Sequence, residues 1–539
     1  MSEISRRGFL KDAGLVAGGI AGVAATGAAL ADEVAWMPET WDAETEILII
    51  GYGFAGESAA LAAAKAGAKA LVIEAAPIEE RGGNSTCCGA CWVTVYNEEL
   101  YARHLGELAF HVTPQNLLDD WAHADLGIAD WFDELDVAHH PLTPNYSHFH
   151  FDPQPDDDPS ILDEDGKVLV GIDMNECIDE NGVGLRGLAL HNLLADKVEA
   201  AGVEVLYENR AMELIQNPLT KEIIGCRAET PDGDKYFKAT KGVLLCCGGF
   251  ENSPELTDTH ILPGARLYPA GSMWNRGDGI RMAAAVGAQL WHMAGIEWSG
   301  YGIKVFGDDQ CTQNAFEKIE GGFIVNRHGE RMYNENKKLR HTKEFPALNF
   351  KGFADDKEAT NEFWGIPSWI IMDETERLEG SSQHVVAGGW IYWHGLYEWS
   401  EDFSKEVENG IMVKGDTIEE LAEKCGLPVD ALSATLKEYN ELAANGDTKY
   451  RRKYIRALEP PYYALVAWPT VFNTQGGPKH SNLNCRCVDY NDVVIPRLYS
   501  CGELGSVYSM LYHGSGNVAE AIMTGKLAAE DAAALTGWE

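Results

Sequence analysis

The 539-residue sequence predicts an α/β fold in which one domain is split by an inserted second domain. Three observations predict this fold class. A buried-strand run at 47–50 opens into a Gly-rich turn and an Ala-rich helix, and another buried strand, at 242–247, ends at a double glycine. From about 253 to 457 the composition becomes aromatic, charged and irregular. The Gly-rich pattern then resumes near 460.

The first Gly-rich turn carries the strongest functional signal. Gly51 permits the tight turn, Gly53 lets the backbone approach a pyrophosphate, and Gly56 lets helix and strand pack closely. Ala55 lies in the same turn, where the helix N-terminus faces the phosphates with its positive dipole end. Glu74 ends the next strand, where an acid can hold a ribose hydroxyl. Together these features predict a Rossmann-like dinucleotide-binding domain.

The following segments continue this domain. Helical apolar spacing at 185–201 precedes a parallel strand at 203–207, and two strands at 223–229 and 235–239 flank a turn cluster, which predicts a hairpin. The order βαβ, hairpin, strand, Gly-Gly is the layout of a flavoprotein rather than of an NAD dehydrogenase, so we expect FAD. Further candidate cofactor-binding residues occupy its loops and strand ends: Asn84, Ser85, Gly89, Ala90, Ala211, Gly248 and Gly249.

The N-terminus predicts export. Arg6 and Arg7 precede an apolar, Gly/Ala-rich run at 13–30 that ends in a small-residue cleavage site. We expect a twin-arginine signal at 1–31, with an uncleaved anchor as the alternative, and export of the folded protein to the periplasm or the outer face of the cytoplasmic membrane. The remaining chain divides into two parts of an FAD-binding domain and a capping domain that binds substrate, at 32–252, 458–539 and 253–457 respectively.

Composition excludes some partners. The 43 basic and 83 acidic residues give a net charge of −40, which repels nucleic acid and anionic lipid. Such a surface favours solubility or a basic electron-transfer partner. No stretch after the signal is long and apolar enough to predict a membrane span.

The 12 cysteines do not follow a ferredoxin or c-type haem pattern. The densest group is Cys87, Cys88 and Cys91. A cluster assembled from distant positions stays open, although for any single cysteine a small buried residue is the favoured interpretation.

The C-terminal motifs resemble those of the FAD-dependent fumarate reductase/succinate dehydrogenase superfamily. The resemblance lies at 473–477, 495–504 and 514–517, and in capping motifs at 277–279, which contains Asp278, and 329–335. It implies non-covalent FAD. It further implies that Glu503 contacts the flavin ribityl chain, and that Asn517 and Val518 begin a helix aimed at the flavin pyrimidine ring.

Two departures from the family bear on substrate. Fumarate reductases place a His and an Arg where this chain has Asn473 and His513, and both clamp a substrate carboxylate, so a small dicarboxylate is disfavoured. The segment from Tyr512 to Gly516 is instead similar to the 3-ketosteroid dehydrogenases. That similarity implies that the Tyr512 hydroxyl and the Gly516 N–H polarise a carbonyl conjugated to a C=C bond. The alternative is that Tyr512 packs against the flavin.

The resemblance also implies a proton donor and electron carriers. Arg377 resembles the proton-donating arginine of fumarate reductases, Tyr333 is the other candidate donor, and Glu335 and Arg340 would relay protons. The chain is further similar to bacterial reductases of cardiac glycosides such as digoxin, which reduce an α,β-unsaturated lactone. That similarity implies a 4Fe-4S cluster, with Cys87, Cys88 and Cys91 as candidate ligands, and a membrane-associated multi-haem c-type cytochrome as electron donor.

We therefore expect an exported flavin-dependent reductase of a C=C bond conjugated to a carbonyl, with a Trp-rich cap suited to a steroid-sized ligand. Three alternatives stay open. They are a respiratory reductase of a small enoate such as cinnamate, urocanate or a fumarate-like acid, a 3-ketosteroid dehydrogenase, and a non-enzymatic flavin electron carrier.

Overall fold

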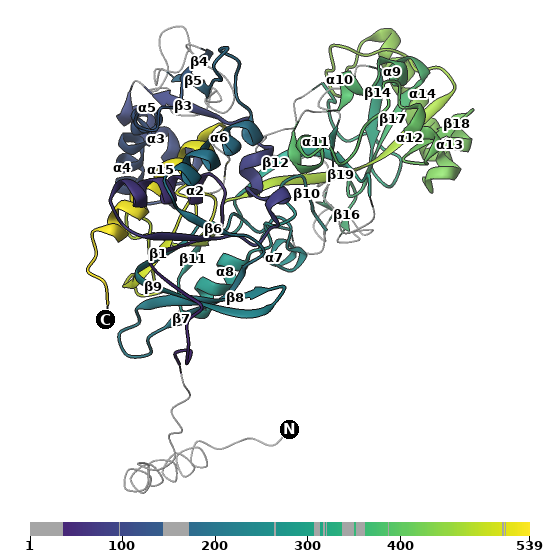
Figure 1. Cartoon of the computed structure of the whole chain (residues 1–539). Coiled ribbons are helices and arrows are strands. Elements are labelled where there is room, and N and C mark those ends of the chain that lie inside the picture. Colours follow the sequence, from purple (N-terminus) through teal and green to yellow (C-terminus); the bar gives the residue numbers. More distant parts are fainter. Residues whose placement is uncertain are drawn as a thin grey trace, which may run out of the picture.

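The computed structural model has two lobes joined by a long strand (Figure 1). The expected export signal lies outside the described residues. Among the helices that are described, none is long and apolar enough to cross a membrane. The structure describes residues 36–95, 97–143, 172–262, 266–306, 313–315, 319, 321–336, 350–351, 362–385, 388–508, 511 and 514–538.

The larger lobe is built on a mostly parallel sheet in the order β21-β22-β9-β1-β2-β6, with β7 and β8 as an antiparallel extension. Its βαβ unit, hairpin and Gly-Gly strand confirm the predicted α/β fold class. The strands are β1 (Ala43–Ile50), β2 (Ala70–Ile73), β6 (Glu204–Leu206), β7 (Arg210–Gln216), β8 (Ile223–Thr230), β9 (Gly233–Leu245), β21 (Arg486–Val488) and β22 (Val494–Ser500).

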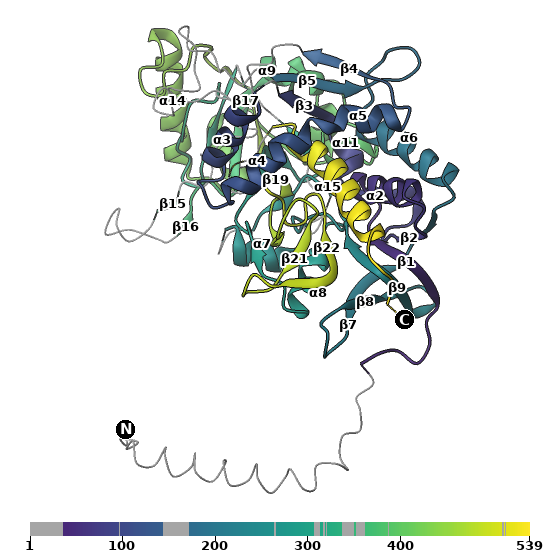
Figure 2. The same ribbon diagram turned by 90° about the vertical axis from the view of Figure 1, so that its left-hand side faces the viewer.

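The apolar run of β1 is continuous because both faces of the sheet are covered. Ile47 and Ile49 enter one core with α2 (Phe54–Lys65), α6 (Gly187–Ala200) and α15 (Gly516–Ala533). Leu48 and Ile50 enter a second core on the opposite face. Figure 2 shows α2 and α15 lying side by side over the sheet.

A small three-stranded sheet and three helices extend the larger lobe beyond α15 (Figure 2). Their chain segment follows the first βαβ half and was not assigned to elements from the sequence. The elements are β3 (Cys91–Val95), β4 (His139–Thr143), β5 (Ile172–Cys177), α3 (Glu98–Leu108), α4 (Gln115–Asp125) and α5 (Gly127–Glu134), with short 3-10 helices η1 (Ile78–Glu80) and η2 (Gly83–Cys87) before them.

The cap lobe contains a sheet in the order β13-β12-β19-β17-β14, to which β10 and β18 add. Helices flank it: α9 (Glu374–Glu379), α10 (Ser381–His384), α11 (Gly389–Trp393), α12 (Ser404–Glu408), α13 (Ile418–Cys425) and α14 (Val429–Asn445). The strands are β10 (Tyr268–Pro269), β12 (Ile296–Ile303), β13 (Gln313–Ala315), β14 (Gly322–Val325), β17 (Ser368–Asp373), β18 (Met412–Gly415) and β19 (Tyr462–Thr474). Two-stranded pairs complete the fold: β11 (Leu290–Trp291) with β20 (Gly477–Pro478), and β15 (Phe350–Lys351) with β16 (Glu362–Phe363).

Both expected domain boundaries differ from the arrangement in the structure. The chain after 253 forms α7 (Pro254–His260) and α8 (Asp278–Ala285), and α8 packs into the core of the larger lobe because Ile280 and Met282 are apolar and buried there. At the other end, β19 begins by pairing with β17 and β18 of the cap before it runs back to the larger lobe (Figure 1).

Candidate functional site

A cavity lies at the carboxyl ends of the parallel strands, the edge at which open α/β sheets bind ligands. Many of the predicted residues line it: Gly51, Gly53, Ala55, Glu74, Asn84, Ser85, Ala211, Gly248, Asp278, Glu503, Asn517 and Val518. The other predicted cofactor residues, Gly56, Gly89, Ala90 and Gly249, lie outside this lining. Further lining residues are not among the predicted cofactor-binding residues; they include Asn209, Arg210, Cys246, Trp274, Asn275 and Cys501.

The Gly-rich turn leaves no room for larger side chains. Gly51 has φ +105°, and a Cβ there would lie 2.3 Å from the Cys246 carbonyl oxygen. A Cβ on Gly53 would lie 2.9 Å from Ser85 Oγ. Gly56 faces the strand, since its Cβ would lie 2.0 Å from the Gly51 carbonyl oxygen. The turn therefore offers bare backbone to the cavity and close packing behind it.

Glu74 is fixed by the turn that it faces. Its Oε2 accepts the Tyr52 N–H at 2.7 Å and its Oε1 accepts the Ala76 N–H at 2.8 Å. Burial raises the pKa of Glu74, while these backbone hydrogen bonds lower it. Each oxygen keeps a further lone pair that can accept a hydrogen bond from a hydroxyl group, such as those of a dinucleotide ribose.

A second carboxylate, Glu503, lies on the cavity wall. It accepts the Thr474 N–H at 2.9 Å and Asn84 Nδ2 at 3.0 Å. Asn84 Nδ2 also donates to Glu251, a buried acid that the sequence interpretation missed. The only available signal was its position, two residues after the Gly-Gly pair at 248–249.

Asp278 is held at the first turn of α8 by Arg210, whose Nε and Nη2 each donate to it at 2.7 Å. This pairing neutralises both charges in the cavity wall. Asp278 follows Gly277, which has φ +75° at the helix N-cap. Because Arg210 lies on β7, the ion pair connects the hairpin to α8.

The N-terminus of α15 points polar groups into the cavity. Asn517 and Val518 line it, Gly516 is buried, and the dipole of this 18-residue helix presents its positive end there. Asn517 Oδ1 and Asn209 Oδ1 are buried and lack a hydrogen-bond partner among the residues that the structure describes. Unsatisfied atoms in a cavity wall indicate a polar ligand. With the bare Gly-rich turn and Glu74, they fit an elongated dinucleotide such as FAD.

Comparison with known proteins gives the same result. Residues 46–518 match the family model described as FAD binding domain. The chain belongs to this FAD-binding family. The cavity lined by the Gly-rich turn, Glu74, Glu503 and α15 is its candidate FAD cavity.

Relatives of this FAD-binding protein include two kinds of flavoenzyme. The 3-oxosteroid 1-dehydrogenase of Mycobacterium tuberculosis is 27% identical over 65% of this chain. The match spans 63% of that relative's own length. The probable fumarate reductase Ifc3 of Shewanella frigidimarina is 24% identical over 91% of this chain and 75% of its own. The 3-ketosteroid delta1-dehydrogenase of Sterolibacterium denitrificans, solved in complex with 1,4-androstadiene-3,17-dione, shares the fold with a TM-score of 0.69. The sequence identity is 18%, and the match covers 91% of this chain and 99% of that protein's chain.

The candidate catalytic residues of the cap lie apart from this cavity lining. Tyr333 is buried in a cap core with Tyr301 and Ile370, and its pKa is raised well above the usual value, first by burial. The Glu335 carboxylate pairs with Arg331 in the cap interior. Tyr512 and Arg340 fall outside the described residues, so their roles stay predictions.

Arg377 is buried in the cap, where acidic groups engage it. Its Nε and Nη2 donate to the two oxygens of Glu374, at 2.9 and 2.8 Å. Its Nη1 donates to the Asp402 carbonyl oxygen and lies 3.6 Å from the Asp402 carboxylate. The ion pair raises the pKa of Arg377 and lowers that of Glu374 to about 2. Its assignment as proton donor stays a prediction.

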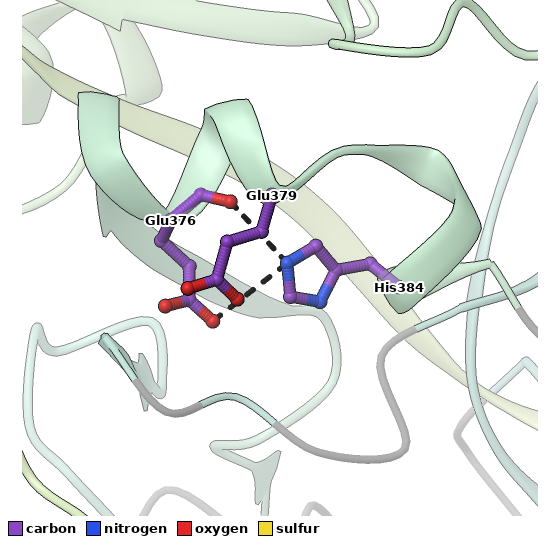
Figure 3. A group of neighbouring side chains, drawn as sticks. All are labelled: Glu376, Glu379 and His384. Carbon is purple, nitrogen blue, oxygen red and sulfur yellow. Dashed lines mark hydrogen bonds and ion pairs between the residues drawn. The ribbon is translucent and has the colours of Figure 1, made fainter.

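Beside Arg377, three side chains of α9 and α10 converge: Glu376, Glu379 and His384 (Figure 3). Within the described part of the chain they are the one group whose ligand atoms are close enough to hold a single metal ion. However, His384 Nε2 lies 3.3 Å from the Glu376 carbonyl oxygen, and the Glu376 carboxylate accepts the Gly321 N–H at 2.6 Å. Arg456 lies 3.7 Å from the same carboxylate. These contacts explain the arrangement without an ion.

The candidate cluster cysteines lie around η2 and β3. Cys88 lines the FAD cavity, and its thiol donates to the Ser85 carbonyl at 3.3 Å. Cys91 donates to the Gly89 carbonyl at 3.4 Å. Burial raises the pKa of Cys88 to about 12 and that of Cys91 to about 11, which favours the thiol over the metal-binding thiolate. The 4Fe-4S cluster stays a prediction from the resemblance.

Proposed function

We propose that this FAD-binding protein is an oxidoreductase that acts on a carbon–carbon bond next to a neutral carbonyl group, as a reductase of the conjugated C=C. Its relatives named as 3-oxosteroid dehydrogenases and fumarate reductases support this reaction class. FAD, when bound, supplies the two-electron chemistry of hydride transfer. The protein supplies binding, orientation and the groups that polarise the carbonyl.

One observation carries the preference for a neutral substrate. Asn473 lines the cavity at the position where fumarate reductases have a carboxylate-binding His. Its Nδ2 donates to Glu297 at 2.8 Å, and its Oδ1 accepts Gln475 Nε2 at 3.1 Å. Both ends of the amide are thus engaged, and an acid stands directly behind it. An anionic substrate would meet this amide, with a carboxyl group behind it, instead of a cation.

Aromatic packing beside the cavity supports a large apolar substrate. Trp390 and Ile391 of α11 form a cluster with Phe472, and Trp274 and Trp393 pack against it. Phe472 and Trp274 also line the FAD cavity. The cluster therefore connects the cap to the cofactor site with apolar surface of the kind that a fused-ring ligand needs.

Within this class we propose the α,β-unsaturated lactone of cardiac glycosides such as digoxin as the substrate. In this proposal the Gly516 N–H and the Tyr512 hydroxyl polarise the lactone carbonyl. Gly516 is buried at the start of α15, next to the cavity-lining Asn517, which supports its part. A 3-ketosteroid is the second candidate, because its carbonyl is also neutral.

The remaining assignments concern electron supply and location. We propose that a basic c-type cytochrome donates electrons, since the net charge of −40 favours association with a cationic partner. We also propose export by the twin-arginine pathway, on the strength of the segment at 1–31. Mass spectrometry of the mature N-terminus from a cell-envelope fraction tests cleavage after residue 31.

The decisive experiment mixes the reduced, FAD-loaded protein anaerobically with digoxin, a 3-ketosteroid, cinnamate and fumarate in separate stopped-flow runs. Rapid return of the oxidised flavin absorbance with digoxin supports the lactone reductase. A response to the ketosteroid alone favours the second candidate. A response to the acids alone contradicts the neutral-substrate proposal, and no response to any of the four contradicts the reaction class.

A further inference from the structure

Two carboxyl groups meet at the wall of the FAD cavity. Glu503 lines the cavity, and Glu251 lies behind it with 2% of its surface exposed. A single donor connects them, because Asn84 Nδ2 lies 2.8 Å from Glu251 Oε1 and 3.0 Å from Glu503 Oε2. The two oxygens are therefore neighbours.

A second amide fixes the same pair. Asn275 Nδ2 lies 2.8 Å from Glu251 Oε1 and 3.4 Å from Glu503 Oε2. Gly249 packs against both acids, since a Cβ there would lie 2.1 Å from Glu503 Oε1 and 2.9 Å from Glu251 Oε2. The two shared amides therefore hold the carboxyl groups side by side.

We propose that Glu251 is a positioning residue that acts on the flavin site through Glu503: the two groups hold one proton between them when the bound flavin is oxidised, and take up a second when it is reduced. Two buried carboxylates that share donors cannot both stay ionised, because their repulsion is strong where water is excluded. A single shared proton removes that repulsion and places a hydrogen bond between the acids.

The pKa values of the pair agree with this arrangement. Burial raises the pKa of Glu251 well above its usual range, and the neighbouring Glu503 raises it further, so Glu251 holds the first proton. Burial raises the pKa of Glu503 to about 7, while hydrogen bonds with Thr474 and Asn84, and then with Glu251, lower it. These contacts together keep Glu503 titratable near neutral pH.

Other charged groups around the pair do not remove this coupling. Glu520 of α15 faces Glu503 and is itself an acid, whose pKa burial raises to about 8. Arg210, on the same cavity wall, is held by Asp278. The positive end of the α15 dipole faces the cavity, but its electrostatic effect falls off within the first turn of the helix.

Charge balance then follows. Two electrons from an external one-electron donor and one proton from water reduce the bound flavin, which becomes negative. That charge raises the affinity of the pair for protons, so a second proton from water binds to Glu503. Two electrons are accompanied by two protons in the pH range where Glu503 changes state, and by one proton below that range.

The test is the midpoint potential of the bound flavin as a function of pH, measured by mediated reductive titration of the FAD-loaded protein. In the wild type we expect the potential to fall about twice as steeply with pH above neutrality as below it. In Glu251→Met, whose side chain has no donor for Glu503, loss of the hydrogen bond to Glu503 moves the onset of the steep range upward by about one pH unit. Identical profiles in both proteins would overturn the proposal.

Two further measurements keep the test decisive. Asp125→Asn removes another buried acid, outside the cavity lining, and should keep the wild-type profile. If Glu251→Met does not retain FAD, reduced-minus-oxidised infrared spectra of the wild type replace it. The proposal requires gain of a protonated-carboxyl band just above neutral pH, and absence of that band at every pH overturns it. The inference rests on FAD binding alone, so its outcome is independent of the substrate.

Discussion

Glu335 and Arg331 form a two-point ion pair in the interior of the cap, with hydrogen bonds of 2.9 and 2.7 Å and side chains 0% and 1% exposed. Arg452 approaches the same carboxylate at 3.2 Å, and Asp447 approaches Arg331 at 3.2 Å. The resemblance implied that Glu335 relays protons. In the structure, the Glu335 carboxylate connects the segment after β14 to the segment after α14 through buried ion pairs. Such contacts stabilise the cap.

Glu335→Gln should therefore destabilise the cap. Removing the Glu335 charge leaves the two guanidinium groups of this buried network with Asp447 as their one remaining carboxylate in it, and the excess positive charge costs about 3–5 kcal/mol of unfolding free energy. Denaturant titration followed by tryptophan fluorescence measures it. The control is Glu362→Gln, an exposed partner of Arg327, which should change stability by less than about 1 kcal/mol. Lost turnover with unchanged stability would support the relay role instead.

Gly56→Ala should weaken both folding and FAD binding. The new methyl group would lie 2.0 Å from the Gly51 carbonyl oxygen, so α2 must move away from β1 and the Gly-rich turn with it. We expect a loss of about 1–3 kcal/mol of stability and less bound flavin per protein, read from absorbance. Gly537→Ala is the control, because the nearest atoms to its new Cβ, those of Thr240, lie at an ordinary contact distance of 3.6 Å.

Glu74→Gln should weaken FAD binding about 10- to 100-fold. The amide NH2 must face one of the two backbone donors, from Tyr52 and Ala76, that the carboxylate now accepts. Titration of apoprotein with FAD, followed by quenching of flavin fluorescence, gives the affinity. Glu204→Gln, an exposed acid on the neighbouring β6, should bind as the wild type does. Equal affinity in both variants would contradict the role of Glu74.

Asp125 should make stability fall as pH rises. Burial raises its pKa to about 8, so between about pH 4 and 8 the folded protein holds a proton that the unfolded chain releases. The unfolding free energy then decreases by up to about 1.4 kcal/mol per pH unit, and levels off above the folded-state pKa. Asp125→Asn should flatten the profile of unfolding free energy against pH. Asp120→Asn, at an exposed position, should leave the profile unchanged. An equal change of the profile in the two variants would contradict burial of Asp125 as the cause.

Glu297→Gln should relax substrate choice. Removing the acid behind Asn473 lowers the electrostatic cost of a substrate carboxylate, so the ratio of kcat/KM for cinnamate to that for digoxin should rise about 10-fold, or 1.4 kcal/mol. Steady-state assays with a reduced dye as donor measure the ratio. Glu213→Gln, on the exposed side of the hairpin, is the control. An unchanged ratio would remove Glu297 from the explanation of specificity.

Local pattern predicted the FAD domain well. The strand at 47–50, the turn at Gly51 and the acid at Glu74 are close in sequence, and β1, α2 and β2 form as expected. The hairpin of β8 and β9 also follows from a turn signal between two alternating runs. The domain boundaries were less accurate, because α8 carries an apolar face like that of any insert helix and only packing decides which lobe buries it.

The sequence by itself determined the fold class, the Gly-rich turn and the acids that hold a dinucleotide, since these depend on backbone conformation and short-range spacing. Tertiary structure alone decided which distant polar groups meet. Glu251 joins Glu503 across 252 positions through Asn84 and Asn275, and Asn473 is backed by Glu297. Such pairs form because burial forces polar groups to find partners wherever the fold brings them, and sequence spacing carries no record of that.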